Sequence, residues 1–236
     1  MSVSPAGVAG RSPHQRDITR AAILAAARQE LREHGPAGVG MRAIARAVGM
    51  PASSLYRFYA DHAALMTELS VGAYTGLCAQ LVIGRGAANP RDTRAQFHSM
   101  ARAFRQWALT NPDEFGLLCN SPPPCEDSWE EPVFVERARA GSIVGAVVDK
   151  ALSTGQLVPT TGGIEVTRET PGWVDGDGVP ISSAAVQITL GGWAALVGQL
   201  CLEPRRSSMI KDPALHFEQY LDAVTAGMGF IPPTAR

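Results

Sequence analysis

The sequence has few cysteines, and they form no pattern that builds a site. Four occur in 236 residues, at Cys78, Cys119, Cys125 and Cys201, without any Cys-x-x-Cys pair. The first 30 residues lack a continuous apolar core behind a basic start, so a secretory signal is not indicated. We therefore expect no disulfide framework and a cytoplasmic protein with reduced thiols, buried and inert by default, with a redox-sensing thiol as the alternative.

Signatures of catalysis and metal binding are also missing. No Gly-x-Ser-x-Gly or Gly-Lys-Ser/Thr pattern occurs, and the five histidines are scattered without metal-ligand spacing. The acidic turn Asp175-Gly-Asp-Gly178 lacks the further spaced oxygens and the terminal glutamate of a calcium loop. We expect no enzyme activity, no catalytic residue, no cofactor and no metal.

Charge is scarce overall but unevenly distributed. The chain has a net charge of -1, yet eight arginines against four acids give +4 between Arg11 and His62, which leaves -5 for the remainder. A basic head on an acidic body is what a localised phosphate-binding face requires. A chance fluctuation is the alternative reading of charge alone.

The basic segment contains a helix-turn-helix pattern between Thr19 and Tyr59. Apolar residues at helical spacing predict a first helix over Thr19–His34 and a short second helix over Met41–Val48. Gly49 ends the second helix, and a third is predicted over Pro51–Tyr59 because proline is well tolerated in a first turn. Two short helices joined by a tight glycine turn suit a major groove, which admits one helix.

The third helix is expected to present a polar face to DNA. Ser53 and Ser54 are short enough to approach base edges or phosphates, and Arg57 suits guanine or a phosphate. Tyr56 offers its hydroxyl to the DNA backbone, and Arg42 lies near the start of the second helix, where an anion is favoured. On the pattern alone, a solvated helical face in an unrelated bundle is the alternative.

An ordered set of short motifs resembles the TetR family of regulators over about fifty residues. The motifs are Ile23–Ala27, His34-Gly35, Met41–Ala45, Val48-Gly49, Leu55–Arg57 and Ala64-Leu65. The resemblance implies that DNA is contacted by Arg42, Ala52, Ser53, Ser54, Tyr56 and Arg57, and that His62 falls where the family often places a lysine on a phosphate. The chain departs from the family pattern at Gly40, Pro51, Phe58 and Tyr59.

The remaining chain is predicted to be helical. Helices are expected after Asp61 and over Thr93–Leu109, Asp113–Cys119, Pro132–Ser153, Ile181–Leu202 and Ala214–Met228. The predicted fold class is all-α, with a flexible arm (1–15), a three-helix helix-turn-helix domain (16–62) and a helical ligand-binding and dimerisation domain (63–230). Residues 155–180, rich in Gly, Thr and Pro, are expected to form a flexible insertion or a small hairpin.

The charge-free stretch Ile181–Leu202 is long enough to span a bilayer, but it is solitary and contains several polar residues. We interpret it as a helix buried within the monomer or between subunits, with no membrane partner. Its glycines permit close helix approach, so we expect a homodimer through 181–202 and 214–228. A two-fold dimer predicts a palindromic, double-stranded DNA operator.

The middle helices supply large apolar side chains that could surround a small-molecule effector. The candidate lining is Met100, Phe104, Trp107, Phe115, Cys119 and Trp129, with ordinary core packing as the alternative. The predicted function is a sequence-specific transcriptional repressor released from its operator by a small apolar or aromatic ligand. The alternative is an architectural or interaction-only helix-turn-helix protein without effector control.

Overall fold

The computed structural model describes residues 13–119, 131–160, 173–206 and 209–232. Within these residues the structure is helical, and extended pairing is confined to two isolated bridges, Leu157 with Phe230 and Val174 with Pro180. The predicted all-α class is therefore confirmed. The chain divides into two compact units, Met1–Leu69 and Ser70–Arg236, which are described separately below.

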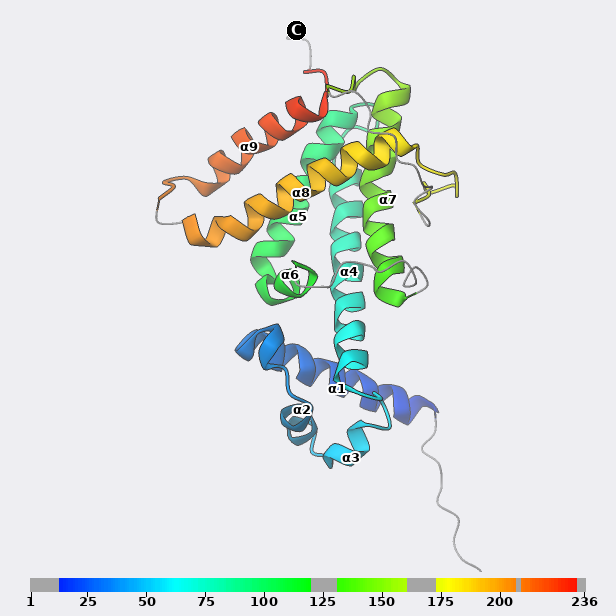
Figure 1. The fold of residues 1–236 in the computed structure, drawn as a ribbon, viewed down its shortest axis with the longest axis vertical. Coiled ribbons are helices and arrows are strands. Elements are labelled where there is room, and N and C mark those ends of the chain that lie inside the picture. The colour runs from blue at the N-terminus through cyan, green and yellow to red at the C-terminus, as the bar shows by residue number, and fades with distance from the viewer. Residues whose placement is uncertain (1–12, 120–130, 161–172, 207–208, 233–236) are drawn as a thin grey trace, which may run out of the picture. The chain divides into compact units, whose positions relative to one another are not determined.

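The N-terminal unit is formed by α1 (Pro13–His34), α2 (Met41–Ala47), α3 (Ala52–Leu55) and the beginning of α4 (His62–Gly86) (Figure 1). Helix α1 begins within the expected arm, whose residues 1–12 lie outside the described residues. A 3-10 turn, η1 (Pro36–Gly38), follows α1 and was not expected from the sequence. The core is made of side chains that are fully or almost fully buried: Ile23, Ala27, Leu31, Ile44 and Leu55.

An ion pair and an aromatic ring join the elements of this unit. The Arg20 guanidinium of α1 donates to both carboxylate oxygens of Glu68 in α4, with Nε–Oε1 and Nε–Oε2 distances of 3.0 and 3.1 Å. It also lies 5.2 Å from the centre of the buried Tyr59 ring. Burial alone would raise the pKa of Glu68, but the hydrogen bonds and the positive charge of Arg20 lower it. The pair therefore stays ionised and links α1 to the start of α4.

The C-terminal unit contains the rest of α4 together with α5 (Thr93–Thr110), α6 (Pro112–Cys119), α7 (Pro132–Ser153), α8 (Ser183–Arg206) and α9 (Pro213–Met228). Figure 1 shows α8 crossing the bundle of α4, α5 and α7, with α9 beside it. Helix α4 continues to Gly86. Gly84 packs closely on α5, since an added Cβ would lie 2.9 Å from the Met100 Cα.

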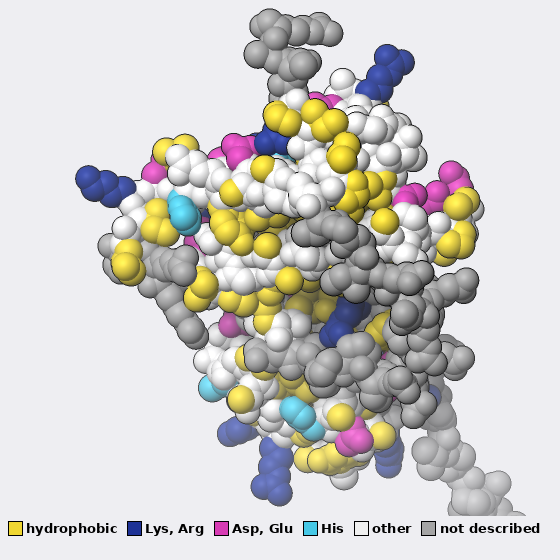
Figure 2. Space-filling model, turned by 45° about the horizontal axis from the view of Figure 1, so that its top comes forward, with side chains coloured by type: hydrophobic (Ala, Val, Ile, Leu, Met, Phe, Trp, Pro, Cys, Tyr) yellow, Lys and Arg dark blue, Asp and Glu magenta, His cyan; other side chains and the backbone are white. Residues whose placement is uncertain are grey.

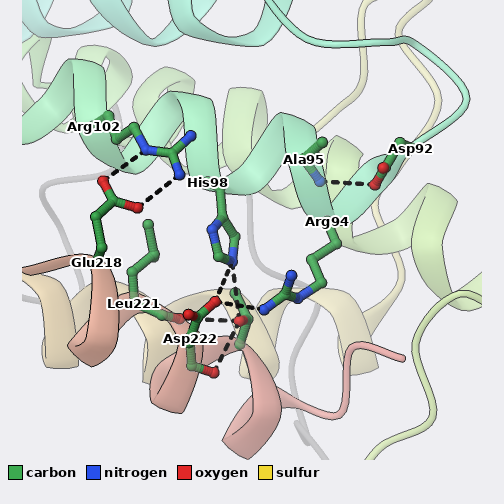
Figure 3. Close-up of polar contacts among 9 residues, drawn as sticks. Asp92, Arg94, Ala95, His98, Arg102, Glu218, Leu221 and Asp222 are labelled. Carbon is green, nitrogen blue, oxygen red and sulfur yellow. Dashed lines mark hydrogen bonds and ion pairs between the residues drawn. The ribbon is translucent and has the colours of Figure 1, made fainter. Parts of the chain in front are cut away.

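Polar contacts hold α9 against α5 (Figure 3). Arg94 donates to Asp222 at 2.7 Å, and Arg102 donates to the Glu218 carboxylate at 2.8 and 2.6 Å. Between them the buried His98 Nε2 lies 3.1 Å from Thr225 Oγ1. Burial, and then the two arginines, lower the pKa of His98, so the imidazole is neutral at pH 7.

Trp173 lies in the stretch 155–180 that was expected to form a flexible insertion or a small hairpin, and it belongs to the core. The Trp173 indole packs against Gly141 of α7, where an added Cβ would approach it to 2.2 Å. The Asp175 carboxylate accepts hydrogen bonds from the backbone of Asp177 and Val179 at 2.9 and 2.8 Å, which makes a tight turn. Burial of a large aromatic ring thus orders a stretch whose composition suggested mobility, while 161–172 lie outside the described residues.

Helix α8 is a long helix with an apolar composition. Among the described residues, the segment Ser183–Glu203 is long and apolar enough to cross a membrane, and 39% of its most apolar window is buried in the structure. The core helices of soluble proteins meet the same criterion. Here α8 packs on α7 and α9 and supplies side chains to the core.

Candidate nucleic-acid interface and effector cavity

Helix α2 has one buried apolar face and exposed arginines on the other side. Met41, Ile44 and Ala45 are buried, whereas Arg42 and Arg46 are exposed one turn apart. Arg46 was not among the predicted contacts, although its i+4 spacing from Arg42 was a usable signal. Gly40 precedes α2 and supplies no side-chain cap at its start.

Helix α3 is shorter than expected but has the predicted orientation. It covers only Ala52–Leu55, after which Tyr56 begins a turn. Leu55 is 0% exposed and Tyr56 is 52% exposed, so the first side chain packs in the core and the next lies in solvent. The remaining candidates divide into exposed (Ser53, Arg57) and half-buried (Ala52, Ser54) residues.

The backbone between the two helices allows this orientation. Gly49 has a φ of 69° and ends α2, and the Met50 N–H donates to the Ala45 carbonyl at 2.9 Å. A left-handed φ is costly for a residue with a Cβ, which explains glycine at this turn. The turn and the buried Leu55 together leave the polar face of α3 in solvent.

His62 has a structural contact that the sequence did not reveal. It is the first residue of α4, and its Nε2 lies 2.9 Å from the carbonyl oxygen of Val39. His62 is otherwise exposed. Because Nε2 lies against the Val39 carbonyl, only Nδ1 is open to a phosphate. Asp61 caps α4 as expected, accepting from the Ala64 N–H at 2.8 Å.

Basic side chains mark the surface of the N-terminal unit, which has no lysine; its arginine side chains project at the lower end of Figure 2. The exposed arginines on or next to the two short helices are Arg42, Arg46 and Arg57. Guanidinium groups donate in a fork that matches phosphate oxygens or the guanine edge. This surface therefore has the charge and donors that a DNA duplex requires.

A cavity of about 470 Å³ lies inside the C-terminal unit. Three predicted residues line it, Phe104, Phe115 and Cys119. Met100 and Trp107 do not line this cavity: both are buried in the core, and an added Cβ at Gly76 of α4 would lie 3.4 Å from the Trp107 indole nitrogen. Trp129 lies outside the described residues.

Most of the lining was missed by the sequence analysis because it converges from α4, α7, α8 and the segment before α8. The missed residues include Tyr74, Phe134, Arg137, Trp173, Thr189, Leu190, Trp193 and Val197. The aromatic rings pack on one another, with Phe104 stacked on Trp193 at 4.7 Å between centroids. Such walls favour a flat apolar molecule.

Three polar groups interrupt the apolar walls. Arg137 Nε donates to Tyr74 Oη at 3.1 Å, and burial raises the pKa of Tyr74 so that it stays a neutral phenol. Thr189 is 1% exposed, and its Oγ1 has no hydrogen-bond partner among the described residues. A buried hydroxyl without a partner is costly, so this group is available to hydrogen-bond a polar atom placed in the cavity.

Both parts of the chain match known families. Residues 23–69 match the family model described as "Bacterial regulatory proteins, tetR family", and residues 97–224 match "Tetracyclin repressor-like, C-terminal domain". The HTH-type transcriptional regulator Rv1816 of Mycobacterium tuberculosis (strain ATCC 25618 / H37Rv) is 31% identical over 223 residues, covering 89% of this chain and 92% of that protein.

Solved structures share the fold. The putative regulatory protein SCO4313 aligns with a TM-score of 0.65 at 23% identity, covering 92% of this chain and 100% of its own. A bacterial regulatory protein in the tetR family from Rhodococcus RHA1 aligns with a TM-score of 0.62 at 15% identity, covering 91% and 98%. With an exposed polar α3 and matches in both units, the chain belongs to the TetR family of DNA-binding transcriptional regulators.

Proposed function

We propose that this regulator is a cytoplasmic repressor that binds a palindromic operator as a homodimer and is released by a small effector. The observation that carries the effector part is the cavity with the unpartnered Thr189 hydroxyl in its wall. The DNA-binding part rests on the outward face of α3.

Operator contact is assigned to Ser53, Tyr56 and Arg57, which are exposed beside the buried Leu55. Arg57 has the reach and the donors for a guanine edge, whereas serine and tyrosine hydroxyls suit phosphates. Arg42 of α2 is assigned to a flanking phosphate. Ala52 and Ser54, in the first turn of α3, are assigned to a phosphate as well. His62 is assigned a phosphate contact through the ring edge not held by Val39.

Dimerisation is assigned to the outer faces of α8 and α9. Gly191 and Gly198 of α8 and Gly227 of α9 have open space where a Cβ would lie, which permits close approach of a second copy. Leu202 and Leu215, 38% and 55% exposed, add apolar surface on the same two helices. Figure 2 shows apolar side chains over this side of the C-terminal unit. Burying such surface favours association.

The effector is a molecule with an aromatic or apolar body and a hydrogen-bond acceptor or anionic group. Stacked rings such as Trp193 accommodate the body, and the donors of Arg137 and Thr189 receive the polar group. This refines the expectation of a small apolar or aromatic ligand, because the guanidinium in the wall was not foreseen.

Release follows from a population shift. Helix α4 begins in the N-terminal unit and carries Tyr74, which lines the cavity. The two recognition helices of the dimer must be about 34 Å apart to enter successive major grooves. A ligand that binds better to one position of α4 changes this spacing and so lowers operator affinity.

The experiment combines a compound screen with operator binding. Thermal-shift assays identify ligands, and gel-shift assays on DNA upstream of the gene measure affinity with and without each ligand. A ligand that occupies the cavity yet leaves operator affinity unchanged would contradict release. A long, sequence-independent footprint would favour the architectural alternative.

A further inference from the structure

Two cysteines from distant parts of the C-terminal unit lie side by side. Cys119 ends α6 and Cys201 lies near the end of α8, 82 residues further along the chain, yet their Sγ atoms are 3.6 Å apart. Both are free and exposed, whereas Cys78 is buried. The expectation of buried, inert cysteines therefore holds for Cys78 and is wrong for this pair.

We propose that Cys119 and Cys201 form a modification site, at which a peroxide oxidises the two thiols to an intramolecular disulfide that joins α6 to α8. One thiolate attacks the peroxide and becomes a sulfenic acid, releasing water; the second sulfur then displaces the sulfenic oxygen as a second water. Two thiols and one hydrogen peroxide thus give one disulfide and two waters. The sulfurs must approach by roughly 1.5 Å to reach bonding distance, which side-chain rotation supplies.

The protonation state of the pair controls the rate. Although Cys119 keeps exposed surface, the partial burial of its thiol, and then the hydrogen bond with Cys201, raise its pKa to about 12, so this thiol is protonated at neutral pH. Because the thiolate is the nucleophile, the disulfide forms slowly at pH 7 and faster at pH 9.

The disulfide would fix two walls of the cavity. Cys119 lines it together with Phe115 and Leu118 of α6, and α8 supplies the facing wall that includes Trp193 and Val197. A covalent link restricts separation of these helices, so entry of a ligand becomes harder. We expect the oxidised protein to bind the aromatic sulfonate 1-anilinonaphthalene-8-sulfonate at least threefold more weakly than the reduced protein.

The test uses the purified full chain with its four cysteines. The reduced protein is treated with hydrogen peroxide at pH 7 and pH 9, free thiols are alkylated, and unreduced peptides are analysed by mass spectrometry. The expected product is one Cys119–Cys201 peptide within a monomer, formed faster at pH 9, while Cys78 is alkylated only after denaturation.

Other products would overturn the proposal. These are a disulfide that contains Cys125, a link between Cys201 residues of two chains, and full alkylation of Cys119 and Cys201 after oxidant treatment. Equal probe affinity before and after oxidation would overturn the effect on the cavity.

A matched pair of variants completes the design. Cys201→Ser should abolish both the cross-link and the change in probe affinity, whereas Cys125→Ser should retain both. The peptide analysis of the unmodified chain requires no variant, so the proposal stays testable if a substitution impairs folding.

Discussion

Replacing Thr189 by valine should stabilise the empty protein and weaken effector binding. The side chain is 1% exposed and its hydroxyl has no partner among the described residues, so no described protein group compensates for its removal from bulk water on folding. Such a group costs about 1–3 kcal/mol, and valine has nearly the same shape without the polar atom. We expect the free energy of unfolding to rise by about 1 kcal/mol, which corresponds to about 2–4 °C in Tm for a domain of this size.

Thr225 provides a matched control, since it is also a buried threonine but is fully bonded. Its hydroxyl donates to the Leu221 carbonyl at 2.9 Å and therefore accepts from His98 Nε2 at 3.1 Å. Thr225→Val should lower the free energy of unfolding by about 1–3 kcal/mol, because it leaves a buried imidazole N–H unpaired.

The assay is chemical denaturation followed by tryptophan fluorescence, with calorimetry for Tm. Effector affinity should fall about threefold to tenfold in Thr189→Val, equivalent to one hydrogen bond of roughly 0.5–1.5 kcal/mol. If Thr189→Val destabilises the protein as much as Thr225→Val does, the hydroxyl is bonded within the protein and the assignment of a ligand contact fails.

Three further predictions concern the DNA face, the core and pH. Arg57→Ala should weaken operator binding by about 1–3 kcal/mol in gel-shift assays; equal loss on all DNA sequences would mean that Arg57 touches only phosphate. Gly141→Ala should destabilise the protein by about 1–3 kcal/mol in urea melts, because the new methyl group meets the Trp173 ring. Gly116→Ala, where the Cβ meets nothing within 4 Å, is its neutral or slightly stabilising control. The pKa of His98 is lowered from its ordinary 6.5, so its contribution to stability is complete above that pH and is lost as the pH falls below it. His98→Gln should flatten this part of the curve of unfolding free energy against pH, and an unchanged slope would refute the assignment.

Ion pairs from α5 hold α8 and α9, the two helices proposed to form the dimer interface. Arg94 and Arg102 bind Asp222 and Glu218, and further along α5 the half-buried Arg105 donates to Glu203 of α8 at 3.0 Å. Because a single helix, α5, holds both α8 and α9, the two helices are positioned before any second copy binds.

The sequence by itself determined the all-α class, the helix-turn-helix and the outward face of α3. These follow from local causes: apolar residues at helical spacing bury Leu31 and Ile44, a positive φ requires Gly49, and the buried Leu55 leaves its neighbour Tyr56 in solvent. The shortness of α3 escaped prediction because helix ends depend on contacts as well as on pattern.

Only the tertiary structure decided which side chains share the cavity and which cysteines are neighbours. Met100 and Phe104 lie one turn apart on the same apolar face, yet Phe104 lines the cavity and Met100 does not. Arg137 and Thr189 reach the cavity from helices remote in sequence, and Cys119 meets Cys201 across 82 residues. Periodicity identifies the buried face of a helix, but the depth and direction at which helices cross determine what each buried residue touches.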